Sequence, residues 1–142
     1  MRNRFWVGLG LSTCLTTPAA AESWYQIAST DDSIEFADAD SLSHDHGVTG
    51  LTIFRGLDST VNPYVKVGVE LNCGSNQFRL TSVQNFGPSK EYLSADPTES
   101  AWSAITANTI GEAVKQFACD GLLRSTPVSD PAAEEYFYYY YY

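Results

Sequence analysis

The chain contains three cysteines, the side chains in it best suited to covalent chemistry. Cys14 lies in an apolar N-terminal segment, whereas Cys73 and Cys119 lie in the body of the chain. Removal of the N-terminal segment would leave an even pair, which in an exported protein indicates a disulfide. We therefore predict a Cys73–Cys119 bridge, with two buried free thiols as the alternative.

His44, Asp45 and His46 are the candidate metal ligands. Histidine and carboxylate both bind zinc, but a zinc site needs three or four converging ligands, and this loop offers two imidazoles. The residues after Asp40 also lack the ligand and glycine spacing of a calcium loop. We predict a solvated turn and no metal site, and keep these three residues as the candidates if the protein binds a metal.

Other motifs of catalysis are missing from the sequence. No nucleophile elbow, phosphate loop or dinucleotide fingerprint occurs in it. Both histidines lie in one loop, so a Ser-His-Asp site would have to be built around that loop. The sequence thus predicts a protein that is not an enzyme and uses no cofactor.

The N-terminus has the pattern of a secretory signal. Arg2 and Arg4 precede an apolar run over residues 5–15, which is far shorter than the roughly 20 residues that span a bilayer. Small residues at 19–21 then supply a cleavage site. We predict a signal peptide over residues 1–21, and a periplasmic, outer-membrane-associated or secreted location in a bacterium. As an alternative, residues 11–14 resemble a lipobox, in which Cys14 would be kept and lipidated.

The chain is acidic, with a net charge of −9, and removal of the two signal arginines makes it more negative still. Such a domain is repelled by nucleic acid and by anionic lipid. We therefore expect a protein or another envelope component as its partner. We expect no nucleic-acid binding and no transmembrane span.

Alternating apolar residues and turn signals predict an antiparallel meander of about six strands. The expected strands cover residues 24–28, 34–37, 48–57, 64–73, 77–86 and 90–95. In the fourth, Val65, Val67, Val69, Leu71 and Cys73 share one face, which favours a sheet with one dry side. The polar segment 38–47 is expected to be irregular.

A short helix follows the strands. Thr109 and Glu112 match a capping box, and apolar residues at helical spacing follow as far as Ala118. A helix of nine or ten residues is unstable alone, so it must pack against the sheet. The expected fold class is α+β, with an antiparallel sheet, a C-terminal helix packed on it and one disulfide.

These features resemble the surface-adhesin protein E-like domain family of Gram-negative bacteria over about residues 24–119. The residues that carry the resemblance are Trp24, the segments Phe36-Ala37-Asp38 and Ser41-Leu42, Cys73-Gly74, Arg79, Trp102, Ile105 and Cys119. The resemblance implies a small sheet tied to a helix by the disulfide, an envelope location and a binding role without chemistry. The founding adhesin binds host proteins through charged surface segments, but no basic binding segment matches here. Ala107-Asn108 replaces the expected Pro-Gly turn.

The C-terminus differs in composition from the rest. Residues 122–135 contain Pro127 and Pro131 and are typical of a linker. An aromatic run follows: Tyr136, Phe137, Tyr138, Tyr139, Tyr140, Tyr141 and Tyr142. Tyrosine favours strands, so our hypothesis is that this run promotes self-association or adhesion, by adding a strand to an exposed sheet edge. A disordered extension without function is the alternative.

The predicted division is a signal peptide over residues 1–21, a protein E-like domain over residues 22–121, and a linker with a Tyr-rich tail over residues 122–142. Trp24 and Trp102 are both expected in the core, and Arg79 is expected to pair with Glu70 across two strands. The predicted function is that of an exported, non-catalytic binding module. The alternative is a structural or accessory envelope protein that acts through another envelope component.

Overall fold

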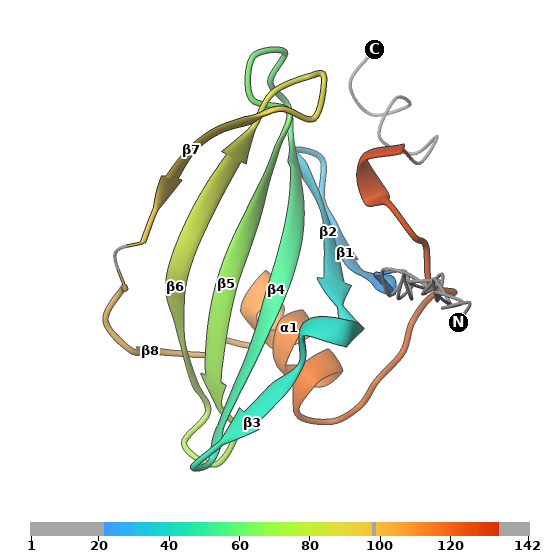
Figure 1. Cartoon of the computed structure of the whole chain (residues 1–142). Helices are drawn as coiled ribbons and strands as arrows, with labels where there is room; N and C mark the ends of the chain where they lie inside the picture. The colour runs from blue at the N-terminus through green and yellow to red at the C-terminus, as the bar shows by residue number, and fades with distance from the viewer. Residues whose placement is uncertain (1–21, 98, 134–142) are drawn as a thin grey trace, which may run out of the picture.

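The computed structural model describes residues 22–97 and 99–133. They form one antiparallel sheet whose main path runs β1-β2-β4-β5-β6-β7 (Figure 1). Its strands are β1 (Trp24–Ser29), β2 (Ser33–Asp38), β4 (Val48–Leu57), β5 (Tyr64–Asn72), β6 (Gln77–Phe86) and β7 (Tyr92–Asp96). The strands of this path occur in chain order, with only the short β3 (Ser43–Asp45) between β2 and β4, so the predicted meander is confirmed.

The sheet has eight strands among the described residues, and the prediction of about six was too low. β3 (Ser43–Asp45) pairs with β4, and β8 (Ser103–Ala104) pairs with β6. His46 and Gly47 have φ angles of 48° and 80°, which are typical of the type I′ turn in a two-residue hairpin. Part of the segment expected to be irregular is therefore a hairpin. Strands this short and polar carry no alternating apolar signal.

The predicted helix is confirmed as α1 (Ile110–Ala118). The Thr109 hydroxyl caps it by accepting the backbone N–H of Glu112 at 3.4 Å, and the Glu112 carboxylate reaches back past Thr109 to accept the N–H of Asn108 at 2.7 Å, one residue earlier than in a standard capping box. Two short 3-10 helices, η1 (Ala39–Ser41) and η2 (Pro131–Ala133), complete the elements. Within the described ranges, no helix has both the length and the apolar character to cross a membrane.

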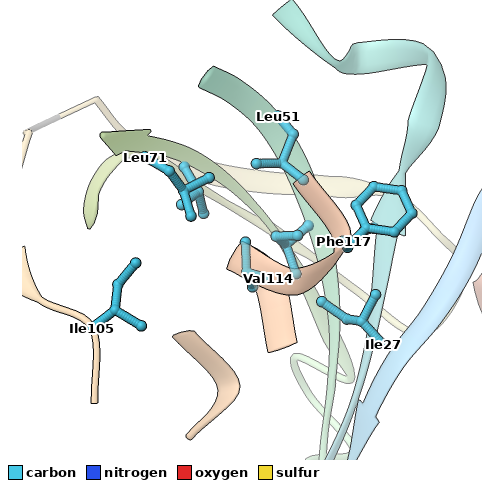
Figure 2. Packing of buried hydrophobic residues seen from close by; sticks show 9 residues of the cluster. Ile27, Leu51, Leu71, Ile105, Val114 and Phe117 are labelled. Atoms are coloured by element: carbon cyan, nitrogen blue, oxygen red, sulfur yellow. The ribbon is translucent and has the colours of Figure 1, made fainter. Parts of the chain in front are cut away.

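Packing and a disulfide hold α1 against one face of the sheet. Val114 and Phe117 belong to the same buried cluster as Ile27, Leu51 and Leu71 (Figure 2). The predicted bridge is confirmed, because Cys73 after β5 and Cys119 after α1 are joined with a Cα–Cα distance of 5.9 Å. A nine-residue helix therefore gains from tertiary contacts the stability that it lacks alone.

The opposite face of the sheet is also covered in part, so the expectation of a single dry side was wrong. A second buried cluster consists of Trp24, Ile34, Phe36, Phe54, Tyr64 and Ala132. Ala132 belongs to the segment expected to be a linker. That segment instead returns to the sheet, where Val128 exchanges both backbone hydrogen bonds with Trp24, at 2.9 and 2.8 Å. It has no periodic apolar pattern, and its position depends on this long-range pairing.

Candidate functional site

The strongest candidate site is a groove of about 400 Å³ between the sheet and α1. The helix lies toward the end of the sheet at which β5 ends (Figure 1), and the groove extends along the apolar face as far as Leu57 and Val65. Its walls come mainly from β4, β5, β6 and α1, through Ile53, Leu57, Val65, Val67, Val69, Phe78, Leu80, Val83, Ile110, Gly111 and Val114. A volume of this size falls within the range of small-molecule sites.

One carboxyl group lines this apolar groove. Glu35 on β2 is 0% exposed, and its register partner on β4 is Arg55. The Ser33 hydroxyl donates to Oε1 of Glu35 at 2.7 Å, and Nε of Arg55 lies 3.3 Å from the same oxygen. The other oxygen, Oε2, is buried and has no hydrogen-bond partner among the described residues. The site therefore pairs apolar walls with one unsatisfied polar atom.

The electrostatics of Glu35 follow from its position. Burial raises the pKa of its carboxyl above the ordinary value of 4.5, while the Ser33 hydrogen bond and the Arg55 charge act in the opposite direction. Arg55 offsets the desolvation only in part, because its side chain is 45% exposed and its charge is screened by water. A carboxyl kept in an apolar environment is a frequent property of functional sites.

Sequence reasoning did not identify Glu35 as a site residue. On β2, Glu35 alternates with Ile34 and Phe36, and the latter two belong to the cluster on the opposite face. The alternation therefore suggests a solvated Glu35. The signal that was present is Arg55, because it shares a strand face with the apolar residues Leu51 and Ile53.

The opposite face carries a row of aromatic rings. Phe54 stacks on Tyr64 with ring centroids 4.8 Å apart, and Tyr64 stacks on Phe86 at 4.9 Å. The Trp24 and Phe54 rings pack in a T-shaped arrangement with centroids 6.2 Å apart, and the ammonium of Lys66 lies 5.2 Å from the Trp24 ring centroid. A second cavity, of about 460 Å³, lies here beneath residues 129–132. This face is a packed core with a partial cover, in which Trp24 takes its predicted core place.

Arg79 organises a separate polar cluster. Its Nη2 lies 2.6 Å from the Glu70 carboxylate, which confirms the predicted cross-strand pair. Its Nη1 also contacts Glu99 at 2.8 Å, and its guanidinium lies over the ring of Trp102. The prediction that Trp102 is a core residue is therefore wrong, because its ring is half-buried and packs under the Arg79 guanidinium. The Arg79 cluster ties the chain between β7 and β8 to the sheet.

The two histidines have different partners. His44 lies on β3, where Nδ1 is 3.0 Å from the Thr49 hydroxyl, while His46 occupies the adjoining turn and contacts the Asp45 carboxylate. The side chains of His46 and Asp45 are 93% and 85% exposed. In residues 22–97 and 99–133, no group of three or more His, Cys, Asp or Glu side chains is placed to hold a metal ion.

The two edges of the sheet differ. The β1 edge is bridged at Trp24 by the returning C-terminal segment. β7 is exposed along its length, with Tyr92 and Leu93 at 59% and 47%, and no strand of the described ranges pairs with its outer side. The residues that the tail hypothesis names, 136–142, and the lipidation candidate Cys14 lie outside the described residues.

The fold is similar to that of Haemophilus influenzae protein E. A structure of its crystal form II matches with a TM-score of 0.53 at 12% sequence identity, and the match covers 79% of this chain and 98% of that chain. A crystal structure of protein E from non-typeable H. influenzae matches with a TM-score of 0.47 at 13% identity, over 74% of this chain and 79% of that chain. No protein-family model and no curated protein matches the sequence. The first likeness shows that this chain has a protein E-like fold, as the sequence resemblance predicted.

Proposed function

We propose that this chain is an exported, non-catalytic binding domain of a bacterial cell envelope. The groove beside α1 carries the proposal, because it combines apolar walls with the unpartnered Oε2 of Glu35. Such a combination suits the recognition of a ligand, where apolar area supplies affinity and a few polar groups supply orientation. The protein E-like fold supports a binding role by analogy with the adhesin-like domains that the sequence resembles.

Export is supported by the sequence of residues 1–21 and by the Cys73–Cys119 disulfide, because disulfides persist in oxidising compartments. The periplasm, the outer membrane and the cell exterior all meet this condition. Retention of Cys14 as a lipidated residue would place the domain at a membrane surface.

Expression of the full chain in a Gram-negative host tests the proposal. We expect the protein in the periplasmic, outer-membrane or secreted fraction, with an intact mass that shows cleavage after Ala21 and a bridge between Cys73 and Cys119. A Cys14→Ser variant is the matched control, since it abolishes lipidation but leaves the signal pattern intact. Recovery in the cytoplasm, with both remaining cysteines open to alkylation, would contradict the proposal.

A second candidate function is that of an accessory protein that acts through another envelope component, and the open β7 edge favours it. An exposed strand offers unpaired backbone groups to a partner strand. A photo-crosslinking residue placed at Leu93 in living cells should capture such a partner. The same residue at Val61, which is 75% exposed and lies outside the strands, is the control and should capture nothing. Equal capture at both positions would contradict strand addition.

For the Tyr-rich run 136–142 we propose self-association through the β7 edge of a second copy. The run follows Glu134 and Glu135, whose charges limit uncontrolled strand pairing. Seven extended residues span about 23 Å, which is enough to pair with a five-residue strand. Truncation after Glu135 tests this proposal, because it removes the run and keeps the segment that covers the sheet.

A further inference from the structure

We propose that the groove beside α1 binds an apolar molecule that carries one hydrogen-bond donor, an amine or an alcohol on a hydrocarbon chain, with the donor placed at Oε2 of Glu35. This inference rests on the proposed binding function and names its ligand class. It follows from three features of the groove: apolar walls, one orphaned acceptor, and a charge pattern that disfavours anions.

The walls select for hydrocarbon. Val67, Phe78, Leu80 and Val83 line the groove and are only half-buried, so they keep apolar surface in contact with water. Removal of such surface from water is favourable in proportion to its area. A flexible hydrocarbon chain can cover this apolar surface better than a polar ligand can. Among the side chains of β4, β5 and β6 that line the groove, only Arg55 could form a hydrogen bond with a ligand.

The unpartnered oxygen of Glu35 favours a ligand that has a hydrogen-bond donor. Oε1 of Glu35 already accepts from Ser33 and faces Arg55, whereas Oε2 is buried without a partner among the described residues. An ionised carboxylate can only accept hydrogen bonds. A buried acceptor without a partner is destabilising, so a ligand that brings an N–H or O–H group to Oε2 removes an existing cost as well as adding a contact.

The charges disfavour an anionic ligand. A carboxylate placed beside Oε2 would meet a second carboxylate at contact distance, and Arg55 is engaged with Glu35 by its Nε and is half in solvent. The chain as a whole has a net charge of −9, which attracts cations and repels anions at longer range. An ammonium group therefore fits this end of the groove, and a neutral hydroxyl also satisfies Oε2.

Calorimetric titration of the purified, disulfide-bonded protein with three eight-carbon probes tests the inference. Octylamine and 1-octanol share an eight-carbon alkyl chain, and octanoate has seven alkyl carbons and one carboxylate carbon, so the three differ mainly in the head group. Each is used below its solubility limit or micelle-forming concentration. We expect octylamine and octanol to bind, and octanoate to bind at least about tenfold more weakly than octylamine. A large advantage of the amine over the alcohol would identify a cationic ligand, and similar affinities a neutral one.

Two variants locate the site. Glu35→Gln should weaken octylamine binding about tenfold, the loss expected for one hydrogen bond to a charged group. Val67→Phe fills the groove from a half-buried position and should weaken all binding, while Asp31→Asn, which removes an exposed carboxylate outside the groove, should change nothing.

Octanoate binding as tightly as octylamine, octylamine binding unaffected by Glu35→Gln, or no binding of any probe would each overturn the inference. These results do not depend on cellular location. A protein that binds octylamine but stays in the cytoplasm would contradict the proposed function alone, and an exported protein that ignores the probes would contradict this inference alone.

Discussion

The guanidinium carbon of Arg79 lies 4.8 Å from the centroid of the Trp102 ring. Arg79 belongs to β6, whereas Trp102 belongs to the connection between β7 and α1, so this contact joins the sheet to the segment that leads into the helix. The backbone reinforces the connection, since Ser100 donates to Leu80 at 2.8 Å and Ile105 donates to Asn76 at 2.9 Å.

Arg79→Ala should loosen the connection between β7 and α1. The variant loses a cation–π contact and two ion pairs, of which the Glu70 pair is mostly buried, and we expect a cost of about 1–2 kcal/mol in the free energy of unfolding. Amide hydrogen exchange should speed up at Ser100 and Ile105. Arg79→Lys keeps the charge but lacks the planar fork of the guanidinium. Its free energy of unfolding should therefore fall between those of the native protein and Arg79→Ala. Unchanged exchange at both amides in Arg79→Ala would show that Arg79 does not hold the segment.

Removal of the disulfide should be costly. The bridge closes a loop of 46 residues, for which the chain-entropy model gives about 4 kcal/mol. The double variant Cys73→Ala/Cys119→Ala should therefore unfold at a much lower denaturant concentration than the native protein, with α1 losing protection first. Native protein treated with a reductant is the control and should behave like the double variant. If the double variant keeps the native midpoint, packing alone holds α1.

Glu35→Gln should stabilise the protein at neutral pH. Burial raises the pKa of Glu35 in the folded state above 4.5, so the folded chain holds this proton more tightly than the unfolded chain. The stability that the protonated group contributes is complete below pH 4.5 and is lost as the pH rises through the folded pKa. Glutamine stays neutral, so the variant does not lose this stability as the pH rises. Its side-chain oxygen can still accept a hydrogen bond from the Ser33 hydroxyl.

Thermal unfolding between pH 4 and pH 8 measures this effect. The melting temperature of Glu35→Gln should exceed that of the native protein at pH 7, and the difference should shrink as the pH falls toward 4. Asp31→Asn, an exposed substitution in the β1–β2 turn, should show no such trend. A Glu35→Gln variant that is less stable at pH 7 would mean that the Arg55 pair outweighs the desolvation of the carboxylate.

The elements that could be predicted from the sequence are those specified by local pattern. β4, β5 and β6 have long alternating runs, and α1 has both a capping box and an apolar stripe, so their positions agree closely with the prediction. The Arg79–Glu70 pair was also predictable, because the two residues flank one short hairpin and fall opposite each other.

The remaining features depend on contacts between distant parts of the chain. Glu35 is buried because β2 pairs with β4 in a register that sets it against Arg55, and no local signal fixes that register. Trp24 is buried in part because Val128 pairs with it, although the two residues stand at opposite ends of the described chain. The groove exists because α1 covers only one part of an apolar sheet face. Sequence periodicity predicts which residues form that face, but it does not predict which part of the face the helix covers.

Two truncations separate the roles of the C-terminal segment. Removal of residues 124–142 deletes the Val128 bridge and the cover over Tyr64, so it should expose the aromatic row and lower the melting temperature. Removal of residues 136–142 alone keeps that cover and should lower the melting temperature much less than the longer truncation. If the tail drives self-association, the shorter truncation should also convert oligomers to monomers in sedimentation velocity, because the strand that pairs with β7 is gone. An oligomeric state that survives this truncation would contradict the tail hypothesis, and a melting temperature unaffected by the longer truncation would show that residues 124–133 contribute nothing to the core.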